Sequence, residues 1–431
     1  MGAPYKKVAF HTFGCKLNFA ETSMLSQSVI DAGYRMVNHE NSADVYVLNS
    51  CSVTENADKK THKFINRVRR TNPFSKVIIV GCYAQLKPQK LAKIPGVYMV
   101  LGHEYKFNLV DYISKIFHHE KPIIKHSKVS EIAEFKSSFS LGERTRSFLK
   151  VQDGCDYNCS FCTIPLARGE SRSGTIIDII KQANLIASKN VKEIVLTGVN
   201  IGDFGVKNNE SFYDLIKELE KINNIERFRI SSIEPNLLSE KIVEFVARSK
   251  KFLPHFHIPL QSGSPSILNK MRRRYKLSLF NQRLSMIKKN IPDASIGIDV
   301  IVGFPGETEY KFNETLSFLK EADFSYLHVF SYSERANTDA KEYDKKINST
   351  VILERSKKLR NLSLKKTNSF YKKNLGSIRK VLIESHDRGT LFGLSENYVK
   401  VKTKGFKKEI NTIMDLKISA IDGNQMEGNR V

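Results

Sequence analysis

Residues 155–162, CDYNCSFC, hold three of the six cysteines of a chain of 431 residues. Their spacing is C-x3-C-x2-C, and they follow an apolar run, SFLKVQDG, that is typical of a buried strand. Structural zinc sites usually use four ligands in paired sets, but the flanking histidines here are the distant His126 and His255. Three thiolates on one short loop instead favour a cubane iron–sulfur cluster that leaves one iron open to a substrate or cofactor. A zinc site, or three free thiols, is the alternative interpretation.

The cysteine loop lies in a long alternation of strand-like and helix-like segments. After SFLKVQDG come the apolar runs EIVLTGVN, ERFRISSIEP, HFHIPLQSG, SIGIDVIVGFPG and YLHVFSYS, separated by helical stretches such as SFYDLIKELEKI. Six β/α units in about 190 residues predict a partial (β/α)6 barrel of the TIM kind over residues 144–345. In such barrels the active site forms from residues at the C-terminal ends of the strands.

The other three cysteines are dispersed but share one plan. Each ends an apolar, β-branched run: KKVAFHTFGC at Cys15, DVYVLNSC at Cys51 and KVIIVGC at Cys82. Helix-like stretches lie between these runs, so residues 1–115 predict an α/β domain with a doubly wound parallel sheet. Loops that follow parallel strands gather at one edge, so we expect the three cysteines to share a metal site. Taken singly, each would be an inert buried thiol.

Three further segments differ in character from these two domains. Residues 116–143 lack clear periodicity and are predicted to be an interdomain linker. Residues 346–375 are predicted to form a basic helix, since lysines recur along a helical pattern that ends near Gly376. Residues 376–431 alternate apolar and polar positions between Gly and Asn turns, which predicts a small antiparallel β-barrel.

The charge balance favours a polyanionic partner. Lys and Arg number 69 against 45 Asp and Glu, a formal net charge of +24, and such an excess suits nucleic acid. A solvated, lysine-rich surface is the alternative. No apolar run is long enough to span a bilayer and no signal peptide is evident, so we expect a cytoplasmic protein without a membrane partner. In that compartment cysteines serve more often as metal ligands or catalysts than as disulfides.

The three-cysteine loop resembles the motif of the radical S-adenosylmethionine (SAM) superfamily. In that superfamily the open iron binds SAM, and one electron cleaves SAM to methionine and a 5′-deoxyadenosyl radical that abstracts hydrogen from a C–H bond. With TFGCKLN, VLNSCSVTENADKK, IIVGCYAQ and QDGCDYNCSFCTIPLARGESRS together, nearly the whole chain resembles the methylthiotransferases. That resemblance implies two [4Fe–4S] clusters, a radical-generating one on Cys155, Cys159 and Cys162, and an auxiliary one, carrying the sulfur, on Cys15, Cys51 and Cys82. It also implies that the C-terminal module is a TRAM-like RNA-binding domain.

Within that family the motifs GCKLN, NSCSVTENADKK and LHVFSYS look most like the branch that acts on threonylcarbamoyladenosine. The implied reaction adds a methylthio group to C2 of that adenosine, beside the anticodon of tRNAs that decode ANN codons. It uses two SAM molecules, an external electron donor, a sulfur source and the tRNA anticodon stem-loop. The chain departs from the branch where PYSPRPGT is usual and SYSERANTDA stands instead (residues 331–340). Three alternatives are an isopentenyladenosine tRNA enzyme, a ribosomal-protein aspartate enzyme and a non-enzymatic, zinc-holding RNA-binding protein.

Further site residues are predicted by position and by family likeness. Candidate SAM contacts lie in the cysteine loop and at the C-terminal ends of the barrel strands: Tyr157, Phe161, Gly198, Asn200, Ser232, Glu234, Gln261 and Asp299. Candidate RNA contacts lie in basic segments, the last two of which also carry aromatic residues: Arg272, Arg273, Arg274, Lys365, Lys366, Lys402 and Lys404. Each polar group or glycine on its own would be a structural cap or a turn, and each basic patch a solvated face.

Overall fold

The computed structural model describes residues 6–116, 122–142 and 145–431, which fall into two compact units. The first unit comprises Met1–Ser140, Phe148–Ser173 and Ser333–Lys341. The second comprises Leu141–Ser147, Gly174–Tyr332 and Glu342–Val431. The first unit therefore contains all six cysteines, although the sequence divides them between two predicted domains (residues 1–115 and 144–345).

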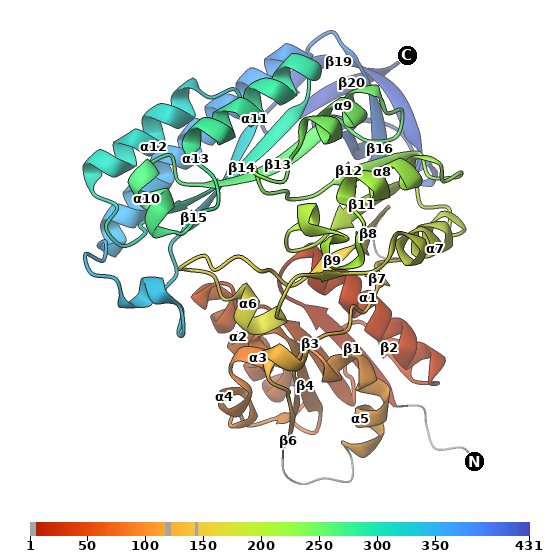
Figure 1. Cartoon of the computed structure of the whole chain (residues 1–431). Helices are drawn as coiled ribbons and strands as arrows, with labels where there is room; N and C mark the ends of the chain where they lie inside the picture. The colour runs from red at the N-terminus through yellow and green to blue at the C-terminus, as the bar shows by residue number, and fades with distance from the viewer. Residues whose placement is uncertain (1–5, 117–121, 143–144) are drawn as a thin grey trace. The chain divides into compact units, whose positions relative to one another are not determined.

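The first unit is built on a six-stranded parallel sheet in the order β2-β1-β3-β4-β5-β6 (Figure 1). The strands are β1 (Lys7–Thr12), β2 (Arg35–Val37), β3 (Val45–Ser50), β4 (Lys76–Gly81), β5 (Val97–Leu101) and β6 (Ile123–Lys125). The helices are α1 (Lys16–Asp31), α2 (Glu55–Thr71), α3 (Cys82–Leu86), α4 (Pro88–Ala92) and α5 (Leu109–Lys115), with a 3-10 turn, η1 (Tyr105–Asn108). Parallel neighbours need crossover connections, and the helices supply them.

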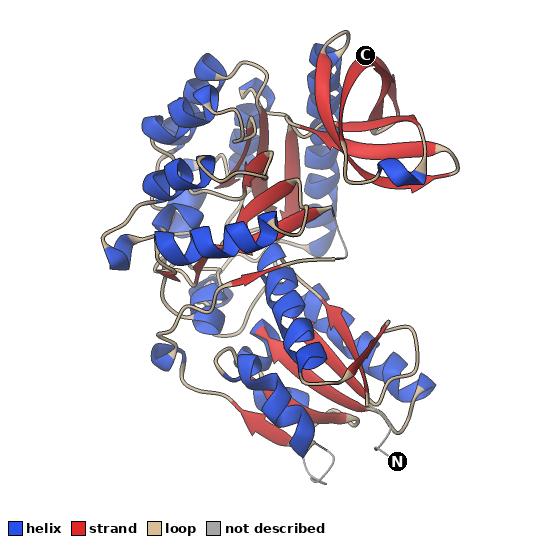
Figure 2. Cartoon of the chain, turned by 90° about the vertical axis from the view of Figure 1, so that its right-hand side faces the viewer, coloured by secondary structure: helices blue, strands red, loops and turns tan. Residues whose placement is uncertain are grey.

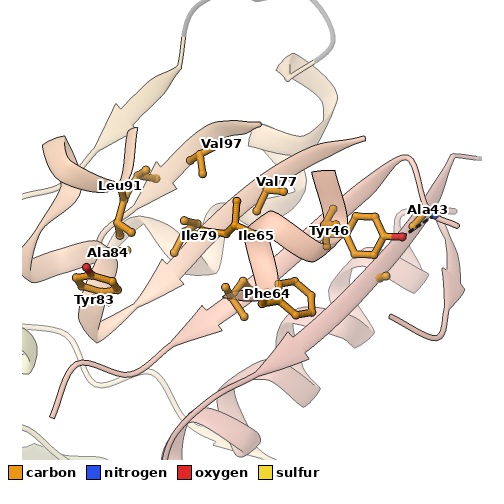
Figure 3. Packing of buried hydrophobic residues seen from close by; sticks show 14 residues of the cluster. Ala43, Tyr46, Phe64, Ile65, Val77, Ile79, Tyr83, Ala84, Leu91 and Val97 are labelled. Carbon is orange, nitrogen blue, oxygen red and sulfur yellow. Dashed lines mark hydrogen bonds between the residues drawn. The ribbon is translucent and has the colours of Figure 1, made fainter. Parts of the chain in front are cut away.

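Both faces of this sheet are covered. Successive side chains of each buried strand point to opposite sides of the sheet, so each strand contributes to an apolar cluster on either face. In β4, Val77 and Ile79 belong to one apolar cluster, which packs against Phe64 of α2 (Figure 3), while Ile78 and Val80 belong to a second. The second cluster includes Leu25 of α1 together with residues of α5. The predicted doubly wound sheet is confirmed.

The cysteine loop of residues 155–162 joins this unit through short elements. It lies between β9 (Gln152–Asp153) and α6 (Ile164–Arg168), and β9 pairs antiparallel with β10 (Arg172–Ser173). The segment predicted as a linker also has structure: β6 extends the sheet, followed by η2 (Val129–Glu131) and β7 (Ser138–Phe139). Strands of two or three residues are too short to show alternation, so periodicity did not reveal them. Residues 117–121 and 143 of that segment lie outside the described part.

The second unit carries the barrel strands that follow the cysteine loop. They are β11 (Glu193–Thr197) paired with β12 (Arg227–Ile230), and β13 (His255–Gln261), β14 (Ser295–Val302) and β15 (Tyr326–Ser331) in a second sheet, with every pair parallel. Their helices are α7 (Ile176–Ala187), α8 (Phe212–Glu220), α9 (Glu240–Arg248), α10 (Pro265–Lys270), α11 (Leu277–Asn290) and α12 (Glu309–Glu321). Strand β8 (Arg146–Lys150) begins in this unit and ends in the first. Alternating parallel strands and helices are the predicted barrel pattern.

The C-terminal part of the second unit is a long helix followed by a small barrel. Helix α13 spans Ser349–Asn374 and leads into a closed β-barrel near the C-terminus (Figure 2). The five strands of this barrel follow the order β16-β17-β18-β20-β19. These strands are β16 (Ile378–Asp387), β17 (Thr390–Ser395), β18 (Lys400–Lys404), β19 (Ile413–Asp422) and β20 (Gln425–Arg430). Val381, Val401 and Leu416 are fully or almost fully buried in its core. The predicted C-terminal β-barrel is confirmed.

Among the helices of the described residues, none combines the length and the apolar character that crossing a bilayer requires.

Candidate functional site

The three dispersed cysteines lie at one edge of the parallel sheet. Cys15 occupies the N-cap position of α1, three residues after the end of β1, Cys51 directly follows β3, and Cys82 begins α3 directly after β4. Because β1, β3 and β4 are neighbours, their C-terminal ends meet. A Cβ atom built on Gly14 would lie 2.9 Å from Cβ of Cys51, so the backbone beside Cys15 approaches Cys51 closely. The sequence argument for a shared site is therefore matched by the placement of the residues.

Burial governs the state of these thiols in the metal-free chain. It raises the pKa of the Cys51 thiol to about 12, and the neighbouring sulfur of Cys82 adds to the rise. It likewise raises the pKa of Cys82. Metal ligation requires thiolates, so a metal that binds here must displace protons. Three closely placed thiols whose charged form needs a cation are a donor set that fits an iron–sulfur cluster.

The loop of residues 155–162 presents its sulfurs to backbone donors. The N–H of Tyr157 lies 3.4 Å from Sγ of Cys155, and the N–H of Ile164 lies 3.4 Å from Sγ of Cys162. The N–H of Cys155 donates to the carbonyl of Gly169 at 3.0 Å, which fixes the start of the loop. Hydrogen bonds to the sulfurs are among the features that set the reduction potential of an iron–sulfur cluster.

Within the part of the chain that the structure describes, two sets of His, Cys, Asp and Glu bring three ligand atoms within 4.8 Å of one another: Glu21, His103 and Asp153, and His257, Asp299 and His328.

Residues 333–341 lie against both cysteine-bearing segments within the first unit. Nη2 of Arg335 donates to Oγ of Ser52 at 2.6 Å and to Oδ2 of Asp58 at 2.8 Å, beside Cys51. At the other end, the N–H of Ala340 donates to the carbonyl of Ser160 at 2.8 Å, inside the cysteine loop. The segment therefore ties the two cysteine sites together. Sequence analysis noted only its departure from PYSPRPGT and missed these contacts.

Although residues 331–338 differ from PYSPRPGT at several positions, they retain its Arg and its Thr. Arg335 and Thr338 stand where the Arg and Thr of PYSPRPGT stand, and the hydroxyl of Thr338 donates to the carbonyl of Arg335 at 2.8 Å. Asn337 replaces the glycine and has φ +63°. Asn enters the left-handed region more easily than other non-glycine residues. The loop can thus form without the Pro and Gly residues.

A buried ion network lies beside the sheet edge. Glu21, His103 and Asp153 form one of the two ligand-like sets, but Lys106 approaches Glu21 at 2.7 Å and Lys150 approaches Asp153 at 2.9 Å. Burial would raise the pKa of Glu21, but the adjacent Arg168, Lys106 and Lys150 outweigh it and hold that pKa well below its usual range. The carboxylates are therefore already compensated by cations, so this set is an ion network and not a metal site.

One buried histidine, His103, and one half-buried histidine, His11, make the first unit sensitive to acid. Burial lowers the pKa of His103 to about 3 and that of His11 to about 4, from an ordinary value of 6.5. Below pH 6.5 these histidines bind protons in the unfolded chain but stay neutral in the folded unit. The free energy of unfolding is therefore at its full value above pH 6.5 and falls as the pH drops toward 4. Each such proton costs about 1.4 kcal/mol per pH unit.

Hydrogen exchange of β3 and β4 in the metal-free protein, corrected for intrinsic exchange rates, should show this decline. His103→Gln should remove about one proton from the slope, since His103 is one of the two histidines whose pKa is lowered to about 4 or below. An unchanged slope in that variant would contradict the assignment.

The predicted barrel contacts lie in the second unit, and all but Asp299 are at or beyond strand ends. Gly198 and Asn200 follow β11, Ser232 and Glu234 follow β12, Gln261 ends β13, and Asp299 lies on β14. Gln261 has φ +64° at an irregularity in the β13–β14 register, and such strained backbone is typical of functional sites. The carboxylate of Glu234 pairs with Arg273, so a predicted SAM contact and a predicted RNA contact bind each other.

Two histidines missed by sequence analysis accompany Asp299. Nε2 of His257 lies 2.7 Å from Oδ1 of Asp299, and His328 of β15 completes the second ligand-like set. The three residues come from adjacent parallel strands, β13, β14 and β15. A signal existed, because HFH, IDV and YLH each place a polar side chain within an apolar strand.

The side chains of the predicted RNA contacts differ in exposure. Arg272, Arg274, Lys365 and Lys404 are exposed. Lys366 instead donates to the carbonyls of Lys320 and Ala322 at 2.9 and 2.6 Å. Lys402 pairs with Asp422 and Glu427 at 2.5 and 2.9 Å, and these two carboxylates already neutralise its charge.

The two predicted SAM contacts in the cysteine loop differ in exposure. In the first unit, Tyr157 is buried and Phe161 is half-buried.

The small C-terminal barrel has an open, basic pocket that sequence analysis did not resolve. Its volume is about 460 Å³, and it is lined by His386, Gly389, Lys404, Gly405, Phe406, Lys407 and Arg430. The ring of Phe406 is 70% exposed beside these cations. An aromatic face among cations suits stacking of a base and contact with phosphate.

Comparisons with known proteins identify the family. Residues 7–102 match the model described as "Uncharacterized protein family UPF0004", and residues 149–319 match the radical SAM superfamily. The threonylcarbamoyladenosine tRNA methylthiotransferase MtaB of Bacillus subtilis is 40% identical over 95% of this chain and 93% of its own, and that of Aquifex aeolicus is 39% identical over 93% and 98%. The tRNA-2-methylthio-N(6)-dimethylallyladenosine synthase of Clostridium tetani is 32% identical over 97% and 95%.

A solved structure supports the fold. The radical SAM methyltransferase TsrM from Kitasatospora setae, with cobalamin and a [4Fe–4S] cluster bound, aligns with a TM-score of 0.58 at 13% identity, over 78% of this chain and 77% of that one. Relatives above 30% identity that align over almost the whole chain establish more than the fold. The chain therefore belongs to the radical SAM methylthiotransferases, enzymes that use SAM and [4Fe–4S] clusters.

Proposed function

We propose that this enzyme adds a methylthio group to C2 of threonylcarbamoyladenosine beside the anticodon of ANN-decoding tRNAs. The observation that carries the proposal is the ranking of its relatives. Proteins named for that substrate are 34–40% identical over more than nine-tenths of this chain, while those named for dimethylallyladenosine are 30–32% identical. The second candidate is therefore a dimethylallyladenosine tRNA substrate.

The six cysteines are proposed as the cluster ligands. Cys155, Cys159 and Cys162 would hold the radical-generating cluster, and Cys15, Cys51 and Cys82 the auxiliary one. When bound, the clusters and SAM supply the one-electron chemistry, the sulfur and the methyl group. The chain contributes positions: parallel strand ends fix one trio, and backbone N–H groups orient two sulfurs of the other. A zinc-holding, non-enzymatic protein is disfavoured because the chain belongs to a family of radical SAM enzymes.

The SAM contacts are proposed among the barrel residues at strand ends. Asp299, held by His257, and the strained Gln261 are the best supported, since both combine a polar group with an irregular or paired setting at the C-terminal side of the strands. Gly198, Asn200, Ser232 and Glu234 share that location. The buried Tyr157 is proposed to support the cysteine loop, with Phe161 as the more accessible ring.

A tRNA anticodon stem-loop is proposed as the partner. The net charge of +24, the exposed Arg272, Arg274, Lys365 and Lys404, and the basic pocket around Phe406 support it. A ribosomal-protein substrate gives less reason for this much positive charge. An external electron donor, a sulfur source and a cytoplasmic location complete the proposal, as the chemistry and the substrate require.

An anaerobic assay with SAM and a reductant separates the two tRNA candidates. Two anticodon stem-loops that differ only in the adenosine modification, threonylcarbamoyl or isopentenyl, are compared with an unmodified one. We expect methylthiolated nucleoside from the threonylcarbamoylated stem-loop, at a rate at least about tenfold above the other two, because a site built for a polar substituent rejects one that lacks it. Preference for the isopentenylated stem-loop would overturn the substrate assignment.

A further inference from the structure

The buried ion network of the first unit contains more positive than negative charge. It has two carboxylates for four basic side chains, with one imidazole between them, and no member is more than 7% exposed. Burial lowers the pKa of Lys106 to about 8, so Lys106 is the least firmly protonated of the four. The members are Glu21, His103, Lys106, Lys150, Asp153, Arg168 and Arg172. The imidazole does not add charge, since burial lowers the pKa of His103 to about 3. Uncompensated buried charge is costly, so a network with this excess needs an anionic neighbour.

Arg168 is the member that reaches the dispersed cysteines. Its Nη2 donates to Oδ1 of Asn18 at 2.7 Å, three residues after Cys15. The amide of Asn18 in turn donates to the carbonyls of Phe13 and Ser50, at 2.8 and 3.3 Å, and Ser50 directly precedes Cys51. Arg168 therefore holds, through one amide, the backbone that carries two of the three thiols.

Arg168 also belongs to the segment of the other trio. It ends α6, six residues after Cys162, and α6 packs against α3, the helix that begins with Cys82. Its Nη1 donates to Glu21 at 3.0 Å and to Asp153 at 2.8 Å, so both arms of the guanidinium are committed.

We infer that Arg168 is a positioning residue for the auxiliary cluster, supplying the buried positive charge that three thiolates require and fixing the strand ends that present them. This rests on the proposed assignment of Cys15, Cys51 and Cys82 as ligands. Arg168 has two functions that different substitutions can separate, one due to its charge and one due to the planar shape of its guanidinium. The charge favours the more negative, reduced state of a bound cluster, and the planar fork, which Lys lacks, holds Asn18, Glu21 and Asp153 at once.

The test uses the full chain with Cys159→Ala, in which the auxiliary trio alone keeps all its ligands. Arg168→Gln removes the charge and the fork, and Arg168→Lys removes the fork only. Two readouts are measured: the potential at which the reconstituted cluster is half reduced, followed by electron paramagnetic resonance, and the rate of iron loss to a chelator. Arg229→Gln is the matched control, since Arg229 is equally buried and paired with Glu193 in the second unit.

We expect Arg168→Gln to lower the reduced-to-oxidised ratio at a fixed potential about tenfold, which equals about 59 mV for one electron. Iron loss should accelerate in both Arg168 variants, by about tenfold, while Arg168→Lys keeps the parental potential and Arg229→Gln changes neither readout. A parental potential and a parental rate in Arg168→Gln would overturn the inference. If that variant fails to fold, a parental rate of iron loss in Arg168→Lys overturns it equally. Failure of the Cys159→Ala parent to load any cluster would instead refute the proposed ligands.

Discussion

Cys159→Ala should form neither methylthiolated nucleoside nor 5′-deoxyadenosine, whereas Cys82→Ala should still form 5′-deoxyadenosine but no methylthiolated nucleoside. The first variant removes a ligand of the proposed radical-generating cluster and the second removes one of the auxiliary cluster. Each loss should lower product formation by about three orders of magnitude or more, because the ligands of one site act as a unit. Both products are quantified by mass spectrometry from anaerobic reactions with SAM, reductant and the threonylcarbamoylated stem-loop.

The two cysteine variants serve as controls for each other. Cys159 is 8% exposed and Cys82 is 4% exposed, so truncation disturbs comparably buried positions of the same unit. If both variants lost 5′-deoxyadenosine alike, the separate roles of the trios would be contradicted. Persistence of methylthiolated nucleoside in either variant would contradict the assignment of that trio.

Gly154→Ala should destabilise the first unit and displace the cysteine loop. Gly154 directly precedes Cys155, has φ +71°, and a Cβ atom there would lie 1.9 Å from the carbonyl oxygen of Glu170. The left-handed conformation costs a non-glycine residue about 1–2 kcal/mol, and forcing atoms into a packed site costs about 1–3 kcal/mol more. We expect a loss of about 3 kcal/mol, seen as faster hydrogen exchange in the first unit, and loss of iron from the Cys155 trio.

Gly376→Ala is the matched control for that prediction. Gly376 has φ +79°, close to that of Gly154, but a Cβ atom there would meet nothing within 4 Å. It should therefore show the conformational cost of about 1–2 kcal/mol alone, with full iron content. Equal effects of the two substitutions would show that the contact with Glu170 does not constrain the loop.

The parallel sheet and the meeting of Cys15, Cys51 and Cys82 were predictable from sequence. Buried strands such as VYVLNS begin with an apolar run of four residues, and topology then places their C-terminal residues together. Likeness to a known family supplied the ligand roles, which spacing alone left open between iron–sulfur and zinc for the loop of residues 155–162. The C-terminal barrel was predictable because its short strands alternate between clear turn residues.

The ion network was not predictable because its members look like surface residues. Lys106 and Lys150 have no exposed surface, although lysines are usually exposed unless paired. Their partner Glu21 lies 85 and 129 residues away in sequence, and no local pattern links them. The contacts of Arg335 were hidden for the same reason, since Ser52 lies 283 residues before it. Such pairs arise from tertiary packing, which periodicity does not record.

Iron content of the anaerobically reconstituted protein tests most directly whether the chain holds two clusters. The wild-type chain should bind about eight irons, and Cys159→Ala and Cys82→Ala about four each, because each trio is proposed to hold one [4Fe–4S] cluster. Mössbauer spectra should assign all of this iron to cubane clusters. About four irons in the wild-type chain, or no loss of iron in either variant, would contradict the account.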